Sequence, residues 1–167
     1  MHSVTSTLMI ASLLNTLSLD SAVLLTRTYF IFSLVIYISR GRGLLPIKDF
    51  YAGTSPYPSL PGPQPTATKG TLSPSAIPNP WPPIVQTTLV NPNEHLCKVQ
   101  RALMHFAESY GSAEPGTLAS SELEGAEFLD ATLFARVAVL TADRHGWMRE
   151  GEEKADWDFS GFFGVKA

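Results

Sequence analysis

The stretch that decides the fold of this chain is NPNEHLCKVQRALMHFAESY, residues 91–110. Asn91 is the expected N-cap, Pro92 suits the first helical position, and Gly111 is the expected stop. The apolar residues of the stretch recur every three or four positions, which is the spacing of one face of an α-helix. They are Leu96, Val99, Leu103, Phe106 and Tyr110. The pattern predicts an amphipathic helix over 92–110 whose apolar face packs against other helices.

The opposite face of this helix carries candidate catalytic residues. His95 and Lys98 are one turn apart, and Arg101 follows one turn later. A histidine and two cations on one face could polarise a carbonyl group, or hold a phosphate or a phenolate. A solvated face that carries cations for solubility explains the same pattern and is the simpler interpretation.

Downstream, a last helix is predicted over residues 121–143. Ser121 and Glu124 have the spacing of a capping box, and Gly146 after His145 is the expected end. Apolar residues again recur at helical spacing. They are Ala126, Leu129, Leu133, Val137 and Leu140.

Two charged residues and an aromatic tail belong to the same region. Asp130 and Arg136 are six positions apart, so they do not pair on one helix, and each needs a partner elsewhere if it is buried. The tail from Trp147 onward is aromatic and acidic. Because a free tail of this kind would expose large apolar rings, we expect it to dock on the helices.

Upstream, residues 56–83 hold ten prolines in 28 positions. Each proline removes a backbone donor and fixes φ, so no regular element is expected there. A loop or linker is the simpler interpretation, and a ligand for an SH3- or WW-type module is the alternative. At its end, Asn79–Pro83 is expected to be the entry into a short helix that runs through Leu89, because proline is tolerated in a first turn.

The N-terminal region contains an apolar run that could span a membrane or pack inside a protein. Residues 22–38 read AVLLTRTYFIFSLVIYI, which is the shortest run that spans a bilayer. Arg27 within the run disfavours insertion. A helix buried inside a larger helical protein is therefore preferred. A membrane span and a signal peptide are the alternatives, and the signal peptide is disfavoured because no basic n-region precedes the apolar residues. A separate helix should precede this one, with Asp20 as the N-cap of the second.

Three further residues near the N-terminal helices are candidate site residues. Arg40 and Arg42 follow the apolar run, where cations interact favourably with the helix dipole. That effect is sufficient for a structural role, and binding of a cofactor phosphate is the alternative. His2 is a candidate catalytic residue, although a histidine at a chain start is usually a frayed terminal residue.

Composition excludes several functional classes. The 167 residues carry a formal net charge of −3, which disfavours a nucleic-acid binder. The single cysteine, Cys97, excludes an intramolecular disulfide framework, and the four widely spaced histidines make no metal motif. The sequence contains no dinucleotide fingerprint, phosphate-binding loop or nucleophile elbow. Only 16% of the residues are charged, which is few for the surface of an isolated domain.

These observations predict an all-α fold. We expect an irregular domain of about five helices with a long proline-rich loop, forming part of a larger helical fold. The chain would consist of an apolar helical segment (1–55), the proline-rich loop (56–83) and an amphipathic helical region with an aromatic tail (84–167), all within one partial domain.

Several strings, taken in order, resemble the questin oxidase-like family of fungal proteins. They are His2–Ser6, Leu24–Tyr29, Arg40–Arg42, Asn79–Trp81, Glu94–Lys98 with Arg101–Leu103, Leu129–Ala138, and Trp157–Phe159. The ordered set is more specific than any single string. Because family members are longer, the resemblance implies that this chain corresponds to their C-terminal part.

The resemblance implies an all-helical, intracellular, cytoplasmic oxidoreductase of polyketide pathways. The activity it suggests is a Baeyer–Villiger-type ring opening of an anthraquinone or related aromatic polyketide, supported by NADPH. Four candidate catalytic residues match recurring family positions: His2, His95, Lys98 and Arg101. Their cationic face would stabilise a developing oxyanion, and Arg40 and Arg42 are the candidate cofactor-binding residues.

Two alternatives accompany this interpretation. The chain could be an inactive fragment of such an enzyme. It could also be a small non-catalytic protein that residues 22–38 anchor in a membrane, with the proline-rich stretch as a spacer.

Overall fold

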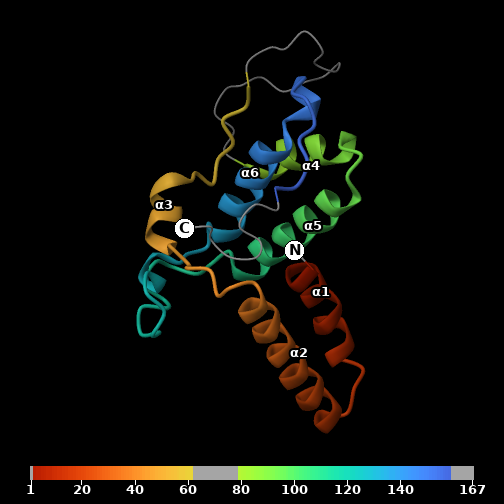
Figure 1. Ribbon diagram of the computed structural model, residues 1–167, viewed down its shortest axis with the longest axis vertical. Coiled ribbons are helices and arrows are strands. Elements are labelled where there is room, and N and C mark those ends of the chain that lie inside the picture. The colour runs from red at the N-terminus through yellow and green to blue at the C-terminus, as the bar shows by residue number, and fades with distance from the viewer. Residues whose placement is uncertain (1, 62–78, 159–167) are drawn as a thin grey trace. The chain divides into compact units, whose positions relative to one another are not determined.

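The computed structural model describes residues 2–61 and 79–158 of the chain (Figure 1). These residues form six α-helices and two short 3-10 helices, with no β-strand among them, so the all-α prediction is confirmed. The helices are α1 (His2–Leu14), α2 (Leu19–Ser39), α3 (Ile47–Gly53), α4 (Trp81–Val90), α5 (Glu94–Tyr110), η1 (Ala126–Phe128), α6 (Leu133–His145) and η2 (Met148–Glu150).

The chain divides into two compact units, each with its own packing. Helices α1 and α2 belong to one unit, and Pro46–Trp157 form the other. Helix α3 belongs to the second unit because it packs against η1.

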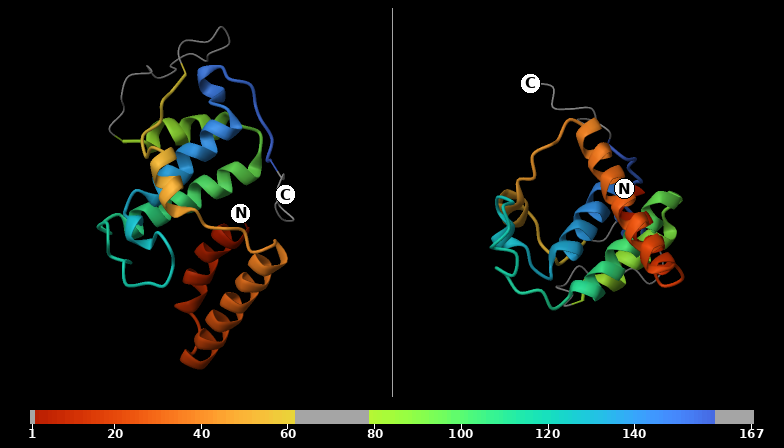
Figure 2. Two further views of the ribbon diagram at one scale, coloured as in Figure 1. Left: turned by 60° about the vertical axis from the view of Figure 1, so that its left-hand side comes forward. Right: turned by 90° about the horizontal axis from the view of Figure 1, so that it is seen from below.

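The core of the second unit lies between α4, α5 and α6, which run side by side (Figures 1 and 2). Its buried members are Leu60, Ile84, Val99, Leu103, Ala138, Val139, Ala142 and Trp147. Small alanines on α6 let the backbone of α5 approach closely. At this contact the buried side-chain amide of Gln100 donates to the carbonyl oxygen of Ala138 at 2.9 Å.

The predicted apolar face of α5 is confirmed for its first half. Leu96, Val99 and Leu103 are buried. Further along, Phe106 is half-buried and Tyr110 is 57% exposed. Both of these rings lie within 6 Å of the Phe134 ring of α6, at 5.7 and 5.9 Å between centroids, so the helix pair ends in an aromatic contact at its rim.

The start of α5 differs from the prediction. The helix begins at Glu94 and its N-cap is Asn93, whose side-chain oxygen accepts from the backbone N–H of His95 at 3.0 Å. Asn91 instead accepts from the N–H of Asn93 at 2.9 Å, so it forms an Asx turn ahead of the helix. The two asparagines are equally able to cap, and the sequence pattern placed the cap two residues early. The predicted stop at Gly111 is confirmed.

The predicted helix over 121–143 is wrong in its first half. Helix α6 begins only at Leu133, and residues before it form turns and η1. Gly125 explains the difference: its φ is +82°, and a Cβ there would lie 3.0 Å from Cβ of Ile47. Ser121 makes no capping box, since its hydroxyl accepts from the N–H of Leu123 within a turn.

The C-terminal aromatic tail docks as expected as far as it is described. Trp147 is 2% exposed and belongs to the core, and Trp157 packs against the same cluster. The buried His145 accompanies them: its ring lies 4.1 Å from that of Trp157, and its Nδ1 is 2.9 Å from the carbonyl oxygen of Ala155. The aromatic residues after position 158 lie outside the described residues.

Gly146, which ends α6 as predicted, is required by the turn that follows. Its φ is +83°, and a Cβ at this position would lie 2.3 Å from the backbone oxygen of Glu153. We expect Gly146→Ala to lower the free energy of unfolding by about 2 kcal/mol or more, because strained backbone and a backbone clash act together. Gly116→Ala is the matched control, since φ is +85° there but the space is open, and about 1 kcal/mol is expected. Equal losses in chemical denaturation would contradict the clash.

The proline-rich segment is only partly described. Pro58 and Leu60 are buried, and Leu60 contributes to the core. Residues 62–78, on which the SH3- or WW-ligand alternative largely falls, lie outside the described residues. The predicted short helix is confirmed as α4, with Pro82 and Pro83 in its first turn, so regular structure begins inside the segment predicted to have none.

The other unit is an antiparallel pair formed by α1 and α2. Helix α2 begins earlier than predicted, at Leu19, and its N-cap is Ser18 rather than Asp20. The hydroxyl of Ser18 accepts from the N–H of Ser21 at 3.4 Å. Asp20 lies in the first turn, where its negative charge favours the helix dipole.

No residue of helix α2 is buried. One side of it is half-buried, and the other side chains are exposed; the half-buried residues are Ala22, Leu25, Tyr29, Ser33 and Ile36. Among the described residues it is the one helix long and apolar enough to cross a membrane. Core helices of soluble proteins and N-terminal signal sequences satisfy the same criterion. Among the described residues α1 is the helix that packs against α2, and it covers one side of α2 only in part, so the larger helical cover of the preferred sequence interpretation is not seen there.

Candidate functional site

The exposed face of α5 brings two predicted catalytic residues together around a third residue. The carboxylate of Glu94 lies 3.3 Å from Nζ of Lys98 and 3.8 Å from Nε2 of His95. The His95 side chain is 38% exposed and the Lys98 side chain 52% exposed. The sequence analysis did not predict this bridging position of Glu94. The cluster can therefore offer a histidine and a cation to a ligand from solvent, with their charge partly balanced by Glu94.

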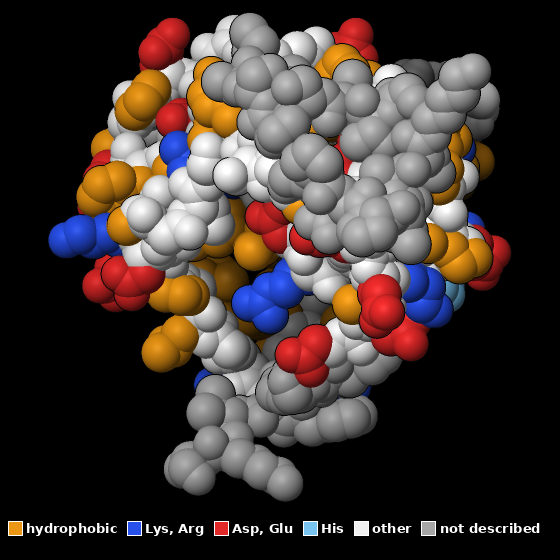
Figure 3. Space-filling view, turned by 90° about the horizontal axis from the view of Figure 1, so that it is seen from above, with side chains coloured by type: hydrophobic (Ala, Val, Ile, Leu, Met, Phe, Trp, Pro, Cys, Tyr) orange, Lys and Arg blue, Asp and Glu red, His pale blue; other side chains and the backbone are white. Residues whose placement is uncertain are grey.

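Arg101 and His105 continue this face along α5. Both are exposed, and the His105 ring makes an edge contact with Phe106 at 5.4 Å. Cys97, the single thiol, is also exposed. Figure 3 shows acidic and basic side chains interspersed over the described surface that it views. The α5 face carries both signs of charge, on Glu94, Lys98 and Arg101, which a solvated surface and a ligand-binding surface have in common.

The remaining candidate residues belong to the other unit. His2 begins α1, and Arg40 and Arg42 follow the last turn of α2. The backbone N–H groups of Arg40, Gly41 and Arg42 all donate to carbonyl oxygens of α2, between Ile36 and Ile38. These amides cap the helix, so they do not form a nest for a phosphate.

NADPH does not fit the described residues as a bound cofactor. Arg40 and Arg42 offer charge for a phosphate, but at the negative end of the α2 dipole and without backbone donors. The cavity on this unit is an open groove of about 350 Å³, lined by Leu14, Ala22, Val23, Thr26 and Arg27. Its walls are mainly apolar, and they supply no set of donors for a pyrophosphate or a nicotinamide amide.

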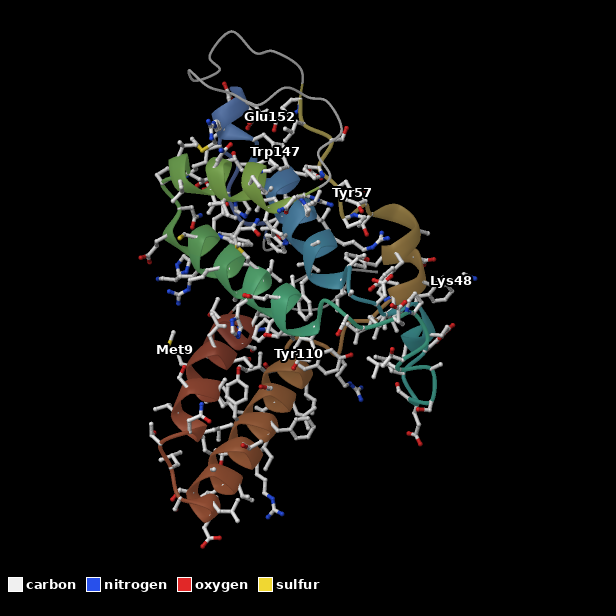
Figure 4. The ribbon with its side chains drawn as sticks, turned by 180° about the vertical axis from the view of Figure 1, so that it is seen from behind. Met9, Lys48, Tyr57, Tyr110, Trp147 and Glu152 are labelled. Carbon is white, nitrogen blue, oxygen red and sulfur yellow. The ribbon has the colours of Figure 1, made fainter. Side chains whose placement is uncertain are left out.

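A second polar cluster, which the sequence did not indicate, surrounds Trp147. The indole N–H donates to a carboxylate oxygen of Asp143 at 2.8 Å, and the backbone N–H donates to Glu152 at 2.8 Å. Figure 4 shows Trp147 and Glu152 close together at the end of α6. Desolvation raises the pKa of Asp143, and the negative charge of Glu152 adds to this shift. The described residues contain no group of three side chains placed to bind a metal ion.

Glu150 is buried next to this cluster. It is 1% exposed, and neither carboxylate oxygen makes a hydrogen bond of normal geometry. Burial is the main cause that raises the pKa of Glu150, and the charge of Glu152 also contributes. The folded protein therefore binds a proton at Glu150 more tightly than the unfolded chain does.

The pH dependence of stability follows from this raised pKa. Below the ordinary glutamate pKa, both states are protonated and Glu150 carries no penalty; as pH rises through the folded pKa, stability is lost. We expect Glu150→Gln to match the parent protein in acid and to exceed its free energy of unfolding at neutral pH by about 1–3 kcal/mol. Denaturant unfolding across pH tests this, with the exposed Glu153→Gln as control. A constant difference at all pH values would contradict it.

The expectation that Asp130 and Arg136 need separate partners is confirmed. Asp130 accepts from the hydroxyl of Tyr51 at 3.3 Å, and Nη1 of Arg136 donates to the backbone oxygens of Tyr51 and Thr54. The Arg136 guanidinium also lies 4.7 Å from the centroid of the Tyr51 ring. The hydroxyl of Thr132 links the two residues. It donates to a carboxylate oxygen of Asp130 at 2.6 Å and accepts from Nε of Arg136 at 2.8 Å. The network joins α3 to α6, and its groups are satisfied internally, which is typical of a structural tie.

The fold and site together define an all-helical protein with an exposed histidine–lysine face and no nucleotide-binding cradle among its described residues. The profile of the questin oxidase-like family matches residues 1–103, which is more than half of the chain. The chain belongs to the questin oxidase-like family, and it is thus a relative of oxidase-type enzymes. No curated protein and no solved structure matches it.

The matched range contains every candidate site residue. His2 lies at its start, Arg40 and Arg42 lie in its first half, and His95, Lys98 and Arg101 lie near its end. The strings at 129–138 and 157–159, which carried part of the resemblance, lie outside the match.

Proposed function

We propose that this chain acts in the oxidation of an aromatic polyketide, with the α5 face as the part that meets the substrate. Family membership supports an oxidoreductase role. The observation that favours the α5 face is the convergence of His95, Lys98 and Glu94 on one exposed turn inside the matched range. The expected substrate is an anthraquinone or a related phenolic quinone.

The proposed reaction is a Baeyer–Villiger-type insertion of oxygen. One atom of O₂ enters the bond between the carbonyl carbon and its neighbouring ring carbon, and the other leaves as water. Two electrons and two protons are required for each insertion. Because the described residues form no cradle for NADPH, the NADPH that the family resemblance implies would supply the electrons as a co-substrate from solution and not as a resident cofactor. Lys98 would stabilise negative charge on the carbonyl oxygen, and His95 would donate or accept the proton at that atom.

An assay of the full chain with questin, NADPH and O₂ tests this proposal. We expect quinone-dependent consumption of NADPH and a product heavier than the quinone by one oxygen atom in the mass spectrum. Titration of the quinone without NADPH measures binding separately. The absence of both binding and turnover, under conditions in which a longer family member is active, would contradict the proposal.

A second candidate function rests on the exposure of α2. A non-catalytic protein anchored through this helix would explain why a largely apolar helix of 21 residues has no buried residue. Co-sedimentation with phospholipid vesicles in the absence of quinone turnover would support this candidate. A protein that stays in the supernatant when vesicles are sedimented would contradict it.

A further inference from the structure

The open groove of about 350 Å³ on the unit formed by α1 and α2 has a lining that is mainly aliphatic. One lining residue, Leu14, comes from the last turn of α1, and the other four come from α2: Ala22, Val23, Thr26 and Arg27. Leu14 and Ala22 are half-buried, and the other three are exposed. The volume lies at the small end of the range for small-molecule sites, so the groove has room for one narrow ligand.

Arg27 is the charged residue of this lining. Its guanidinium makes no hydrogen bond or ion pair among the described residues. Asp20, the one acidic residue in the α2 sequence, is seven positions and about 10.5 Å of helical rise away. The hydroxyl of Thr26 already donates to the carbonyl oxygen of Ala22 at 2.8 Å. The described lining therefore offers one unpaired cation and no further free side-chain donor.

These features select a ligand with one anionic group and an aliphatic body. A guanidinium matches a carboxylate well, because two parallel N–H groups bind its two oxygens. A sugar or a nucleotide carries many polar groups that this groove would leave unpaired, at a cost in affinity. Aromatic rings are absent from the described lining, so a planar quinone gains no stacking there. The small volume favours one acyl chain over the two chains of a phospholipid.

We propose that this groove binds a single-chain fatty acid, with its carboxylate on the guanidinium of Arg27. The acyl chain would pass Val23 and Leu14 toward the connection between α1 and α2. Two further apolar side chains of that region, Leu17 and Leu19, are 40% and 80% exposed, so a longer chain finds more apolar surface there. Each methylene that is removed from water adds to the affinity. The proposal does not depend on the chemistry of the α5 face.

Titration of the full chain with dodecanoate tests the proposal. The fatty acid is kept below its critical micelle concentration, in mildly alkaline buffer in which the carboxylate is ionised. Isothermal titration calorimetry should show saturable binding of one molecule per chain. Arg27→Gln should weaken this binding about tenfold to a hundredfold, because a charge-assisted pair is lost. Arg144→Gln, at an exposed arginine of the other unit, is the matched control and should bind as the parent protein does.

Two comparisons separate the charge from the chain. Dodecanol has the same chain without the carboxylate, so it should bind the parent protein at least about tenfold more weakly than dodecanoate does. Ala22→Leu retains Arg27 but fills the groove, and it should weaken dodecanoate binding while the circular dichroism spectrum stays unchanged.

Three results would overturn the proposal. The first is equal binding of dodecanoate by the parent protein and Arg27→Gln, and the second is equal binding of dodecanoate and dodecanol by the parent protein. The third is co-sedimentation with phospholipid vesicles in the absence of any dodecanoate binding, which would indicate that this part of α2 meets a membrane surface and not a single fatty acid.

Discussion

Replacement of Trp147 by alanine is expected to lower the free energy of unfolding by about 3–5 kcal/mol, the usual cost of removing a large buried aromatic side chain. Trp147 is 2% exposed and packs in the core between α4 and α6. A domain is stable by only about 5–15 kcal/mol, so the variant should be close to unfolding. Urea denaturation followed by circular dichroism measures the effect.

Two matched variants separate the contributions of Trp147. Trp147→Phe retains most of the packing but removes the indole donor to Asp143, and we expect a loss of about 1–2 kcal/mol. Trp157→Ala, at a half-buried position of the same cluster, should cost less than Trp147→Ala. If Trp147→Ala unfolded at the same urea concentration as the parent protein, the core described between α4, α5 and α6 would be wrong.

Periodicity predicted those parts of the fold that depend on local pattern. The apolar stripe of α5, its end at Gly111 and the end of α6 at Gly146 needed only the spacing of residues and the conformational range of glycine. The cap of α5 was misplaced because Asn91 and Asn93 both satisfy the rule, and the choice depends on the turn geometry around Pro92.

Long-range contacts decided what the pattern could not. The apolar residues before Leu133 have helical spacing, yet Gly125 packs against Ile47 from a distant part of the chain. Arg136 likewise finds its acceptors in α3, more than 80 positions earlier. Sequence spacing alone carries no information about such partners.

The candidate site also combines features that follow from local spacing with features that depend on the folded structure. The shared face of His95 and Lys98 follows from helical spacing, whereas the bridging position of Glu94 depends on its rotamer at the helix start. The acidic groups around Trp147 come from the end of α6 and the loop after it, and only folding brings them together.

The extent of the family match has a structural consequence. It ends at Leu103, in the middle of α5. The buried face of α5 packs on Ala138, Val139 and Ala142, which lie beyond the match. Residues 94–103 therefore require α6 for their burial. We expect the α5 face to keep its geometry only in a chain that continues past the matched range and includes α6.

Replacement of His95 by glutamine is expected to reduce kcat for quinone oxidation by about 10²–10⁴-fold, the usual contribution of a positioned acid or base. The variant keeps a polar side chain and leaves the N-cap bond intact, because Asn93 binds the backbone N–H of residue 95. The circular dichroism spectrum should therefore remain unchanged. His105→Gln, on the same helix and also exposed, is the matched control and should stay within about twofold.

The two neighbours of His95 distinguish chemistry from surface charge. Lys98→Met removes the cation and should lower kcat by about tenfold or more. Glu94→Gln removes the carboxylate 3.3 Å from Nζ of Lys98, so the face becomes more positive and KM for a phenolate substrate should fall. If His95→Gln and His105→Gln had equal kcat values, while both folded normally, the α5 face would be a solvated surface and the reacting carbonyl would lie elsewhere.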